Sequence, residues 1–335
     1  MLLISPILSL CIPTYNRSLQ LKNCLLSILS NTFLSDLKSI EIIISDNSDD
    51  IAHSSFTKAL LATLPFLQLD VHYIHNTTNI GFTRNLISVV SQANGRFIWI
   101  VGDDDKFVNN SISHVVSLIQ SQSEIEYIFS PARQVNHLPT LELIDQTDFL
   151  SRLIQRFFLP KTLVSFSYFL RPGFTPDLLG PLYVSIISRD LWLQGLIRFL
   201  ASFPDIKTQA TFSSAESTYP HAFVLYEALS HNSMASSLPF AGIHASIEFR
   251  DWAYRFRFFR IFYHPQMVLY AKQNKLISLT GLIVWFLYIY RSLPLDLIAY
   301  LRYSGSTFLR RHAFRLLLTL ILISFLAILI SHALF

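Results

Sequence analysis

Between residues 7 and 130, short apolar runs alternate with segments of helical periodicity, and this alternation constrains the fold more than any other feature of the chain. Strands joined through helices form βαβ units, and successive units build a parallel sheet that is covered on both faces. We therefore expect an α/β fold with a mostly parallel, Rossmann-like sheet. The predicted strands are Ile7–Ile12, Ile40–Ser45, Val71–His75, Phe97–Val101 and Ile125–Ser130, and the predicted helices cover Leu19–Leu29 and residues 54–64, 82–93 and 110–121.

Polar residues follow each of the first four apolar runs directly. They are Pro13–Arg17, Asp46–Asp50, His75–Asn85 and Gly102–Asp105. In open sheets of this kind, ligands bind outside the carboxyl ends of the strands. We therefore expect the functional side chains in these four loops.

The fourth loop contains three adjacent carboxylates, Asp103, Asp104 and Asp105. Crowded carboxylates repel one another and raise one another's pKa, and a divalent cation relieves this repulsion. Hard oxygen ligands suit Mg²⁺ or Mn²⁺. A solvated acidic turn or a helix N-cap is the alternative interpretation, since Asp favours both. The position after a buried strand, beside a second acidic loop, favours the metal site.

The common nucleotide-binding fingerprints do not occur in the chain. Neither G-x-G-x-x-G nor G-x-x-x-x-G-K-[ST] is found, which disfavours dinucleotide-dependent oxidoreductases and P-loop kinases. A nucleotide held without those loops, through an acidic metal site, suggests a sugar nucleotide.

Four motifs in order resemble those of family 2 glycosyltransferases of the GT-A fold, and most nearly bacterial O-antigen sugar transferases of the abequosyltransferase type. They are SLCIPTYNR (Ser9–Arg17), EIIISDNSDD (Glu41–Asp50), NIGFTRN (Asn79–Asn85) and ANGRFIWIVGDDD (Ala93–Asp105). The resemblance implies a nucleotide-diphospho-sugar transferase fold. Residues 1–130 would form its nucleotide-sugar-binding half, and residues 131–245 its acceptor-binding half.

The resemblance also implies roles for the matching positions. Asp46 would hydrogen-bond a pyrimidine base, Arg84 would contact the base or a phosphate, and Asp104 would hold the metal that bridges to the diphosphate. Gly102 stands where the commoner D-x-D-D pattern has its first Asp, which leaves open whether Asp103 or Asp105 contacts the ribose. The set expected to bind the nucleotide sugar is Pro13, Thr14, Tyr15, Asn16, Asp46, Asn79, Gly81, Arg84 and Asp103, with Asp104 and Asp105 on the Mn²⁺ or Mg²⁺ ion.

The second half of the chain is expected to supply the catalytic base. An inverting sugar transfer needs a carboxylate or imidazole that takes the proton of the acceptor hydroxyl. The candidates for this base are Glu216 and His221. They lie in one loop and the first turn of the helix that follows it, which begins near Pro220. A capping carboxylate and a surface histidine are the alternative interpretation of the same residues.

The C-terminal part of the sequence suggests a membrane. Residues 250–315 hold eleven Lys and Arg against two acidic residues, and the next twenty residues, Leu316–Phe335, carry no formal charge. A helix of that length spans a bilayer core, although a buried core helix is the alternative. Residues 246–315 would then be a basic membrane-surface segment and 316–335 an anchor, with the shorter run Ile277–Tyr290 as an interfacial helix. The basic residues place the preceding chain in the cytoplasm.

We therefore expect a metal-dependent, inverting glycosyltransferase at the cytoplasmic face of the inner (plasma) membrane. Its partners would be a nucleoside-diphosphate sugar, a lipid-linked glycan acceptor of O-antigen or capsule synthesis, and anionic lipid. Nucleic acid is not an expected partner, because the apolar segment explains the basic charges better. The alternative is a catalytically silent protein that binds a sugar nucleotide or a partner enzyme, with Gly102 marking a degraded metal site.

Overall fold

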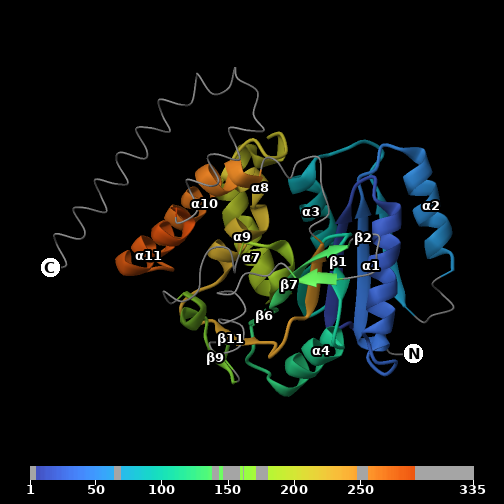
Figure 1. The fold of residues 1–335 in the computed structure, drawn as a ribbon, viewed down its shortest axis with the longest axis horizontal. Helices are drawn as coiled ribbons and strands as arrows, with labels where there is room; N and C mark the ends of the chain where they lie inside the picture. Colours follow the sequence, from blue (N-terminus) through green and yellow to red (C-terminus); the bar gives the residue numbers. More distant parts are fainter. Residues whose placement is uncertain are drawn as a thin grey trace.

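The protein is an α/β sandwich built on an eight-stranded sheet (Figure 1). The computed structural model describes residues 5–63, 69–137, 143–145, 159–160, 162–170, 180–246 and 256–290. The predicted anchor at Leu316–Phe335 lies outside the described residues. None of the helices within the described ranges is long and apolar enough to cross a membrane.

Four parallel strands form one half of the sheet, as predicted. They are β1 (Leu8–Thr14), β2 (Ile40–Asp46), β3 (Asp70–His75) and β4 (Phe97–Ile100), in the spatial order β3-β2-β1-β4. Every residue of β1, β2 and β4 is buried, which explains why their sequences are mostly apolar. β3 lies at the edge and is more exposed.

The other half of the sheet contains a reversal that the sequence did not predict. β10 (Ser185–Ser188) runs antiparallel to both of its neighbours, β4 and β6 (Tyr127–Phe129). β11 (Met234–Ser237) is parallel to β6, and β9 (Val164–Ser165) pairs with β11 in the antiparallel sense. The sheet is thus mostly parallel, and a 3₁₀ turn over Leu182–Val184 leads directly into β10.

Helices cover both faces and enclose two separate cores. α1 (Ser18–Ser30), α2 (Ile51–Leu61) and α4 (Ser111–Ser121) pack on the face that carries Leu10 and Ile44. The opposite face carries Cys11 and Ile43. It is covered by α3 (Phe82–Ser91), α7 (Arg189–Ser202), the short α8 (Ala215–Thr218), α9 (Pro220–Ala228), α10 (Phe256–Gln273) and α11 (Leu279–Tyr290). Adjacent strand residues therefore point into different cores.

The two C-terminal helices of the described chain complete the second core. α11 packs against α10, and Figure 1 shows both, in orange, at the end of the molecule remote from α1 and α2. The Trp285 side chain of α11 is fully buried in that core. This tryptophan therefore contributes to protein packing in the segment that the sequence analysis assigned to a membrane interface.

A second, four-stranded sheet was not predicted from the sequence. Its order is β5 (Lys106–Phe107), β12 (Ile243–Ser246), β7 (Ala132–His137) and β8 (Leu143–Asp145). β5 begins directly after Asp105, and its Phe107 pairs with Ile243 of β12. The small sheet thus fixes the downstream end of the loop that carries the three carboxylates.

Candidate functional site

The first four strands all end at one edge of the large sheet, which we call the carboxyl edge. Beyond the paired strands, the backbone N–H of Asn47 donates to the carbonyl of Thr14 at 2.9 Å. The N–H of Asn76 donates to the carbonyl of Asp46, also at 2.9 Å. These bonds hold the loops side by side. The predicted meeting of the polar loops therefore occurs.

The acidic loop, Gly102–Asp105, is almost fully withdrawn from solvent. Asp103, Asp104 and Asp105 are 5%, 9% and 2% exposed. The Asp105 carboxylate accepts a hydrogen bond of 2.8 Å from the N–H of Gly102, which closes a tight turn. A Cβ on Gly102 would lie 2.9 Å from Oδ2 of Asp105 and 3.0 Å from Oδ1 of Asp104. The glycine therefore gives the carboxylates room to fold back over the turn.

Arg17 faces this loop, and the sequence analysis assigned it no role. Its Nη1 atom lies 3.0 Å from Oδ2 of Asp104 and 3.3 Å from Oδ1 of Asp103. Burial raises the pKa of Asp103 to about 6, an effect that the Arg17 charge opposes and the neighbouring Asp104 reinforces. The crowding of carboxylates expected from the sequence is thus real, and the chain itself places a cation between two of them.

The residues after β1 connect the first loop to the second. The Tyr15 hydroxyl donates to Oδ2 of Asp49 at 3.0 Å, and Nδ2 of Asn16 donates to Oδ1 of the same carboxylate at 2.8 Å. Asn16 adopts a left-handed backbone conformation with φ of 51°. Pro13 is buried within β1, opposite Ser45. Tyr15 is 42% exposed, so its ring remains open to a ligand at the edge.

Asp46 is 1% exposed at the end of β2. Its carboxylate accepts hydrogen bonds from the N–H of Ser48 at 2.9 Å and from the hydroxyl of Tyr73 at 2.7 Å. Burial and the bond to Asp46 raise the pKa of Tyr73 well above its ordinary value. Tyr73 was not a predicted site residue, because the register that sets it opposite Ile44 is a feature of the structure and has no local signal in the sequence.

A network of asparagines shapes the loop that precedes α3. Oδ1 of Asn79 accepts from Nδ2 of Asn47 at 2.6 Å and from the N–H of Gly81 at 2.9 Å. Gly81 has φ of +80°, which favours glycine over other residues at the N-terminus of α3. Nε of Arg84 donates to the carbonyl of Ile80 at 2.6 Å, and the arginine is exposed. Asn79 and Gly81 are therefore joined directly, and Arg84 contacts the same loop through Ile80.

The two candidates for the catalytic base occupy different environments. His221, in the first turn of α9, is 5% exposed, and its Nε2 lies 2.6 Å from the carbonyl oxygen of Gly180. Because a carbonyl only accepts, Nε2 carries the proton. Nδ1 then has no hydrogen-bond partner among the described residues. Burial lowers the pKa of His221 to about 4. Glu216 is half-buried in α8, and no hydrogen bond between it and His221 is found in the described chain.

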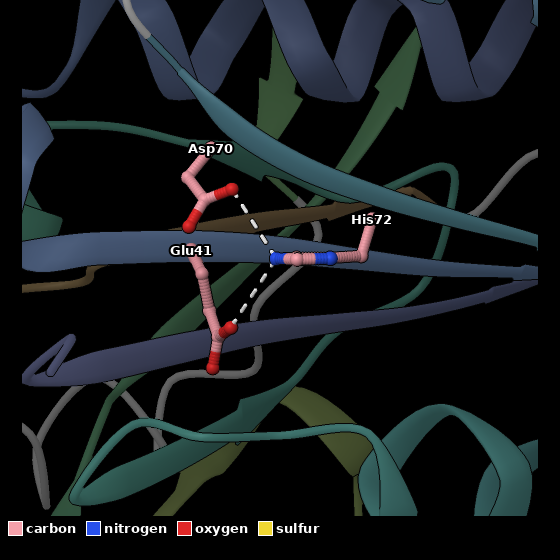
Figure 2. Close-up of side chains that lie close together, drawn as sticks. All are labelled: Glu41, Asp70 and His72. Atoms are coloured by element: carbon pink, nitrogen blue, oxygen red, sulfur yellow. Dashed lines mark ion pairs between the residues drawn. The ribbon is translucent and has the colours of Figure 1, made fainter. Parts of the chain in front are cut away.

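A second cluster of charged side chains lies far from the acidic loop, near the amino ends of the strands. Figure 2 shows Nε2 of His72 between two carboxylates, 3.2 Å from Oδ1 of Asp70 and 3.7 Å from Oε2 of Glu41. One ligand atom from each residue lies within 4.8 Å of the others. Oε1 of Glu41 is occupied by donors from Ser9, Asn94 and Gly95. We interpret the cluster as an ion pair that forms when His72 is protonated.

Comparisons of sequence identify relatives that match about a third of the chain. The chain is 34% identical over 119 residues to the abequosyltransferase RfbV of Salmonella typhimurium, and this match covers 36% of the chain and 34% of that protein. It is 30% identical over 120 residues to the GalNAc(5)-diNAcBac-PP-undecaprenol beta-1,3-glucosyltransferase of Campylobacter jejuni, covering 36% and 35%. The matches thus span about a third of the length of these curated relatives.

Comparisons of structure extend over more of the chain. The mannosyltransferase PcManGT of Pyrobaculum calidifontis, solved with GDP-Man and Mn²⁺, matches 95% of this chain and 81% of its own with a TM-score of 0.57 at 13% identity. TarS of S. aureus, solved with UDP-GlcNAc, matches 85% of this chain and 73% of its own with a TM-score of 0.53 at 14% identity. At these identities the likeness is one of fold, and it supports the expected GT-A-like α/β architecture.

The family model described as Glycosyl transferase family 2 matches residues 9–165, a segment that contains the four motifs and the acidic loop. The resemblance seen in the motifs is therefore confirmed, and the chain carries, over residues 9–165, a glycosyl transferase family 2 domain.

Proposed function

We propose that this protein transfers a sugar from a nucleoside-diphosphate sugar, which binds across the carboxyl edge of the large sheet. The observation that carries the proposal is the buried acidic loop after β4, whose three carboxylates are fixed by Thr14, Arg17 and the Gly102 turn. A solvated acidic turn would not need such support, because exposed carboxylates are stabilised by water.

The chemistry of the acidic loop suits a divalent cation. Asp104 and Asp105 offer hard oxygen ligands, and the guanidinium of Arg17 already places a positive charge beside Asp104. Mg²⁺ or Mn²⁺ held there would neutralise charge that develops on a diphosphate leaving group. In our proposal Asp103, whose Oδ2 accepts from Thr14, orients the loop and contacts the ribose.

The ligands named for the similar solved proteins support a nucleoside-diphosphate sugar as the donor. The solved relatives in fold carry GDP-Man with Mn²⁺ in one case and UDP-GlcNAc in the other. We propose that the base binds at the carboxyl edge, beside the exposed Tyr15 and the carboxylate of Asp46. Asn16, Asn79, Gly81 and Arg84 belong to the same donor site in our proposal.

We favour an inverting reaction with His221 as the base and Glu216 as its partner or replacement. His221 keeps its proton on Nε2, so Nδ1 has the free lone pair that an acceptor hydroxyl requires. Its low pKa keeps that lone pair available at neutral pH, but also makes the imidazole a weak base. Glu216 would need a raised pKa on acceptor binding to act in its place.

For the acceptor we propose a lipid-linked glycan, reached at the cytoplasmic face of the plasma membrane. The name of the Campylobacter relative includes an undecaprenol-linked substrate. The basic residues of 250–315 and the apolar segment 316–335 suit anionic lipid and a membrane anchor. The Arg17 ion pair supports the catalytically silent alternative, because it balances part of the negative charge of the acidic loop without a metal.

A donor screen tests the proposal. Melting temperature is measured with UDP-, CDP-, GDP- and dTDP-sugars, each with and without Mn²⁺. We expect the sugar nucleotides of one base to raise the melting temperature in the presence of Mn²⁺, and to raise it less in EDTA. No shift with any of the donors would contradict the proposed function. Binding without turnover on lipid-linked acceptors would support the silent alternative.

A further inference from the structure

We propose that Arg17 is an internal counterion of the acidic loop, paired with the proposed metal ligand Asp104, and that it passes to the donor diphosphate when the metal binds. The inference rests on the proposed function, which it deepens by assigning a residue that controls metal affinity. Arg17 would be a positioning residue with two alternative sets of partners.

The geometry of the ion pair supports the first set of partners. A single nitrogen, Nη1, approaches both Asp103 and Asp104, at 3.3 and 3.0 Å. The two side chains are 7% and 6% exposed, so water screens their charges little. Asp104 is also a ligand of the proposed metal site. Arg17 and a divalent ion therefore compete for the Asp104 carboxylate.

Charge explains why the arginine is there. The three carboxylates of the loop would leave three negative charges side by side if no cation faced them. One guanidinium removes part of this repulsion and allows the loop to fold before any metal arrives. A divalent ion removes more of it, and the arginine is then no longer needed at this place.

Arg17 is also able to leave. Its side chain is 27% exposed, while the carboxylates are buried. The residue precedes the first turn of α1 as its N-cap, and its side chain makes no capping hydrogen bond there. Within the described chain, its side chain donates to Asp103 and Asp104, so a rotation of the side chain breaks no secondary structure.

The second set of partners follows from what guanidinium groups bind. An arginine released from carboxylates at the carboxyl edge lies where the diphosphate of the donor is proposed to bind. Guanidinium pairs with phosphate oxygens as it does with carboxylates, in a bidentate manner. Neutralising Arg17 should therefore strengthen metal binding and weaken diphosphate binding. A residue that only stabilised the fold would not change the two affinities in opposite directions.

The experiment compares the full chain with Arg17→Gln, Arg17→Met and Arg17→Lys. Mn²⁺ affinity is measured directly by electron paramagnetic resonance, and the affinity for inorganic pyrophosphate by calorimetry at saturating Mn²⁺. Arg189→Gln is the matched control. It also removes one positive charge, but Arg189 donates to the carbonyl of Asn94 near the amino ends of the strands.

We expect both neutral variants to bind Mn²⁺ at least about tenfold more tightly than the wild type. They lose a positive charge that repels the ion from a few ångströms away, at a site where water screens charges poorly. Pyrophosphate should bind about tenfold more weakly to the neutral variants, because they cannot form the charge-assisted pair between guanidinium and phosphate. Arg17→Lys keeps the charge and should bind Mn²⁺ like the wild type, and Arg189→Gln should change neither affinity.

Equal or weaker Mn²⁺ binding by the neutral variants would overturn the inference and leave the proposed function standing. Unchanged pyrophosphate affinity would overturn the exchange of partners. If both neutral variants failed to fold even in millimolar Mn²⁺, the ion would not replace the guanidinium, and the inference would be wrong. Absence of Mn²⁺ binding by every variant, wild type included, would instead remove the metal-dependent function on which the inference rests.

Discussion

The hydroxyl of Thr14 donates a hydrogen bond of 2.7 Å to Oδ2 of Asp103, a residue 89 positions later in the chain. Thr14 is the last residue of β1, and Asp103 follows β4, which pairs with β1 in parallel from Leu8 to Cys11. The strand register thus brings the two side chains together at the carboxyl edge. The position of the carboxylate is therefore a consequence of the sheet.

Replacing Thr14 by Val tests this bond. The variant keeps the side-chain volume and removes the donor to Asp103, so we expect a loss of about 1 kcal/mol in stability and about a tenfold fall in kcat. Thr32→Val is the control, since it removes a buried hydroxyl bond of 2.7 Å to Ile28 away from the acidic loop. Calorimetry and a steady-state assay measure both effects. An equal fall in kcat for both variants would argue against a special role for Thr14.

Glu41 should matter for stability and little for activity. Its buried carboxylate accepts from Ser9 and from the backbone N–H groups of Asn94 and Gly95, which joins β1, β2 and the start of β4. Glu41→Ala leaves these donors unsatisfied, and we expect a loss of about 3 kcal/mol or more. His72→Ala removes only a half-exposed ring and should cost less than about 1 kcal/mol. Urea denaturation distinguishes the two. Similar losses would show that the ion pair of Figure 2 carries the stability instead.

Much of the N-terminal part of the fold, over β1 to α4, could be predicted from the sequence, because its signals are local. Continuous apolar runs mark buried parallel strands, and polar residues mark their ends. The helix predicted at 54–64 begins earlier, at Ile51, because Asp50 caps it by accepting from the N–H of Ala52. That error was avoidable, since Asp is a favoured N-cap.

The remaining features depend on contacts between residues far apart in the chain. β10 is only four residues long, and its antiparallel insertion between β4 and β6 has no local signal. The small second sheet pairs Phe107 with Ile243. Spacing also cannot tell which basic residue faces the acidic loop, so Arg17 was missed while the exposed Arg84 was selected. The roles of Asp46, Asp103 and His221 remain predictions.

The buried imidazole of His221 predicts a specific dependence of stability on pH. Its pKa is about 4 in the folded chain and about 6.5 when the chain unfolds, so only the unfolded state gains a proton between these values. This contribution leaves stability unchanged above pH 6.5 and lowers it by up to roughly 3 kcal/mol as the pH falls to 4. Denaturation of the wild type and of His221→Gln at several pH values measures it. The same slope in both proteins would contradict the assignment.

The role of His221 as base is tested separately from its effect on stability. We expect His221→Gln to reduce kcat at neutral pH by at least about a hundredfold, the usual contribution of general base catalysis. Glu216→Gln should reduce kcat less. Near-normal kcat in both variants with saturating donor and acceptor would place the base elsewhere, with Asp190 and Asp205 as the next residues to replace.

Membrane attachment predicts the behaviour of the whole chain in sedimentation. We expect the protein to pellet with vesicles that contain anionic lipid, through residues 316–335 and the basic residues of 250–315. A variant without residues 316–335 should still bind, but salt should release it because only the screened charge interaction remains. Full-length protein that stays in the supernatant without detergent would contradict the anchor.

The most direct test of the account is the release of nucleoside diphosphate from the donor that the screen identifies, measured with Mn²⁺ for the wild type and for Asp104→Asn. Asp70→Asn, at the start of β3 and far from the acidic loop, is the matched control. The account predicts release by the wild type and by Asp70→Asn, and at least about a thousandfold slower release by a folded Asp104→Asn, in line with the loss of a charge-stabilising group at a reaction centre. Undiminished, metal-dependent release by Asp104→Asn would contradict it.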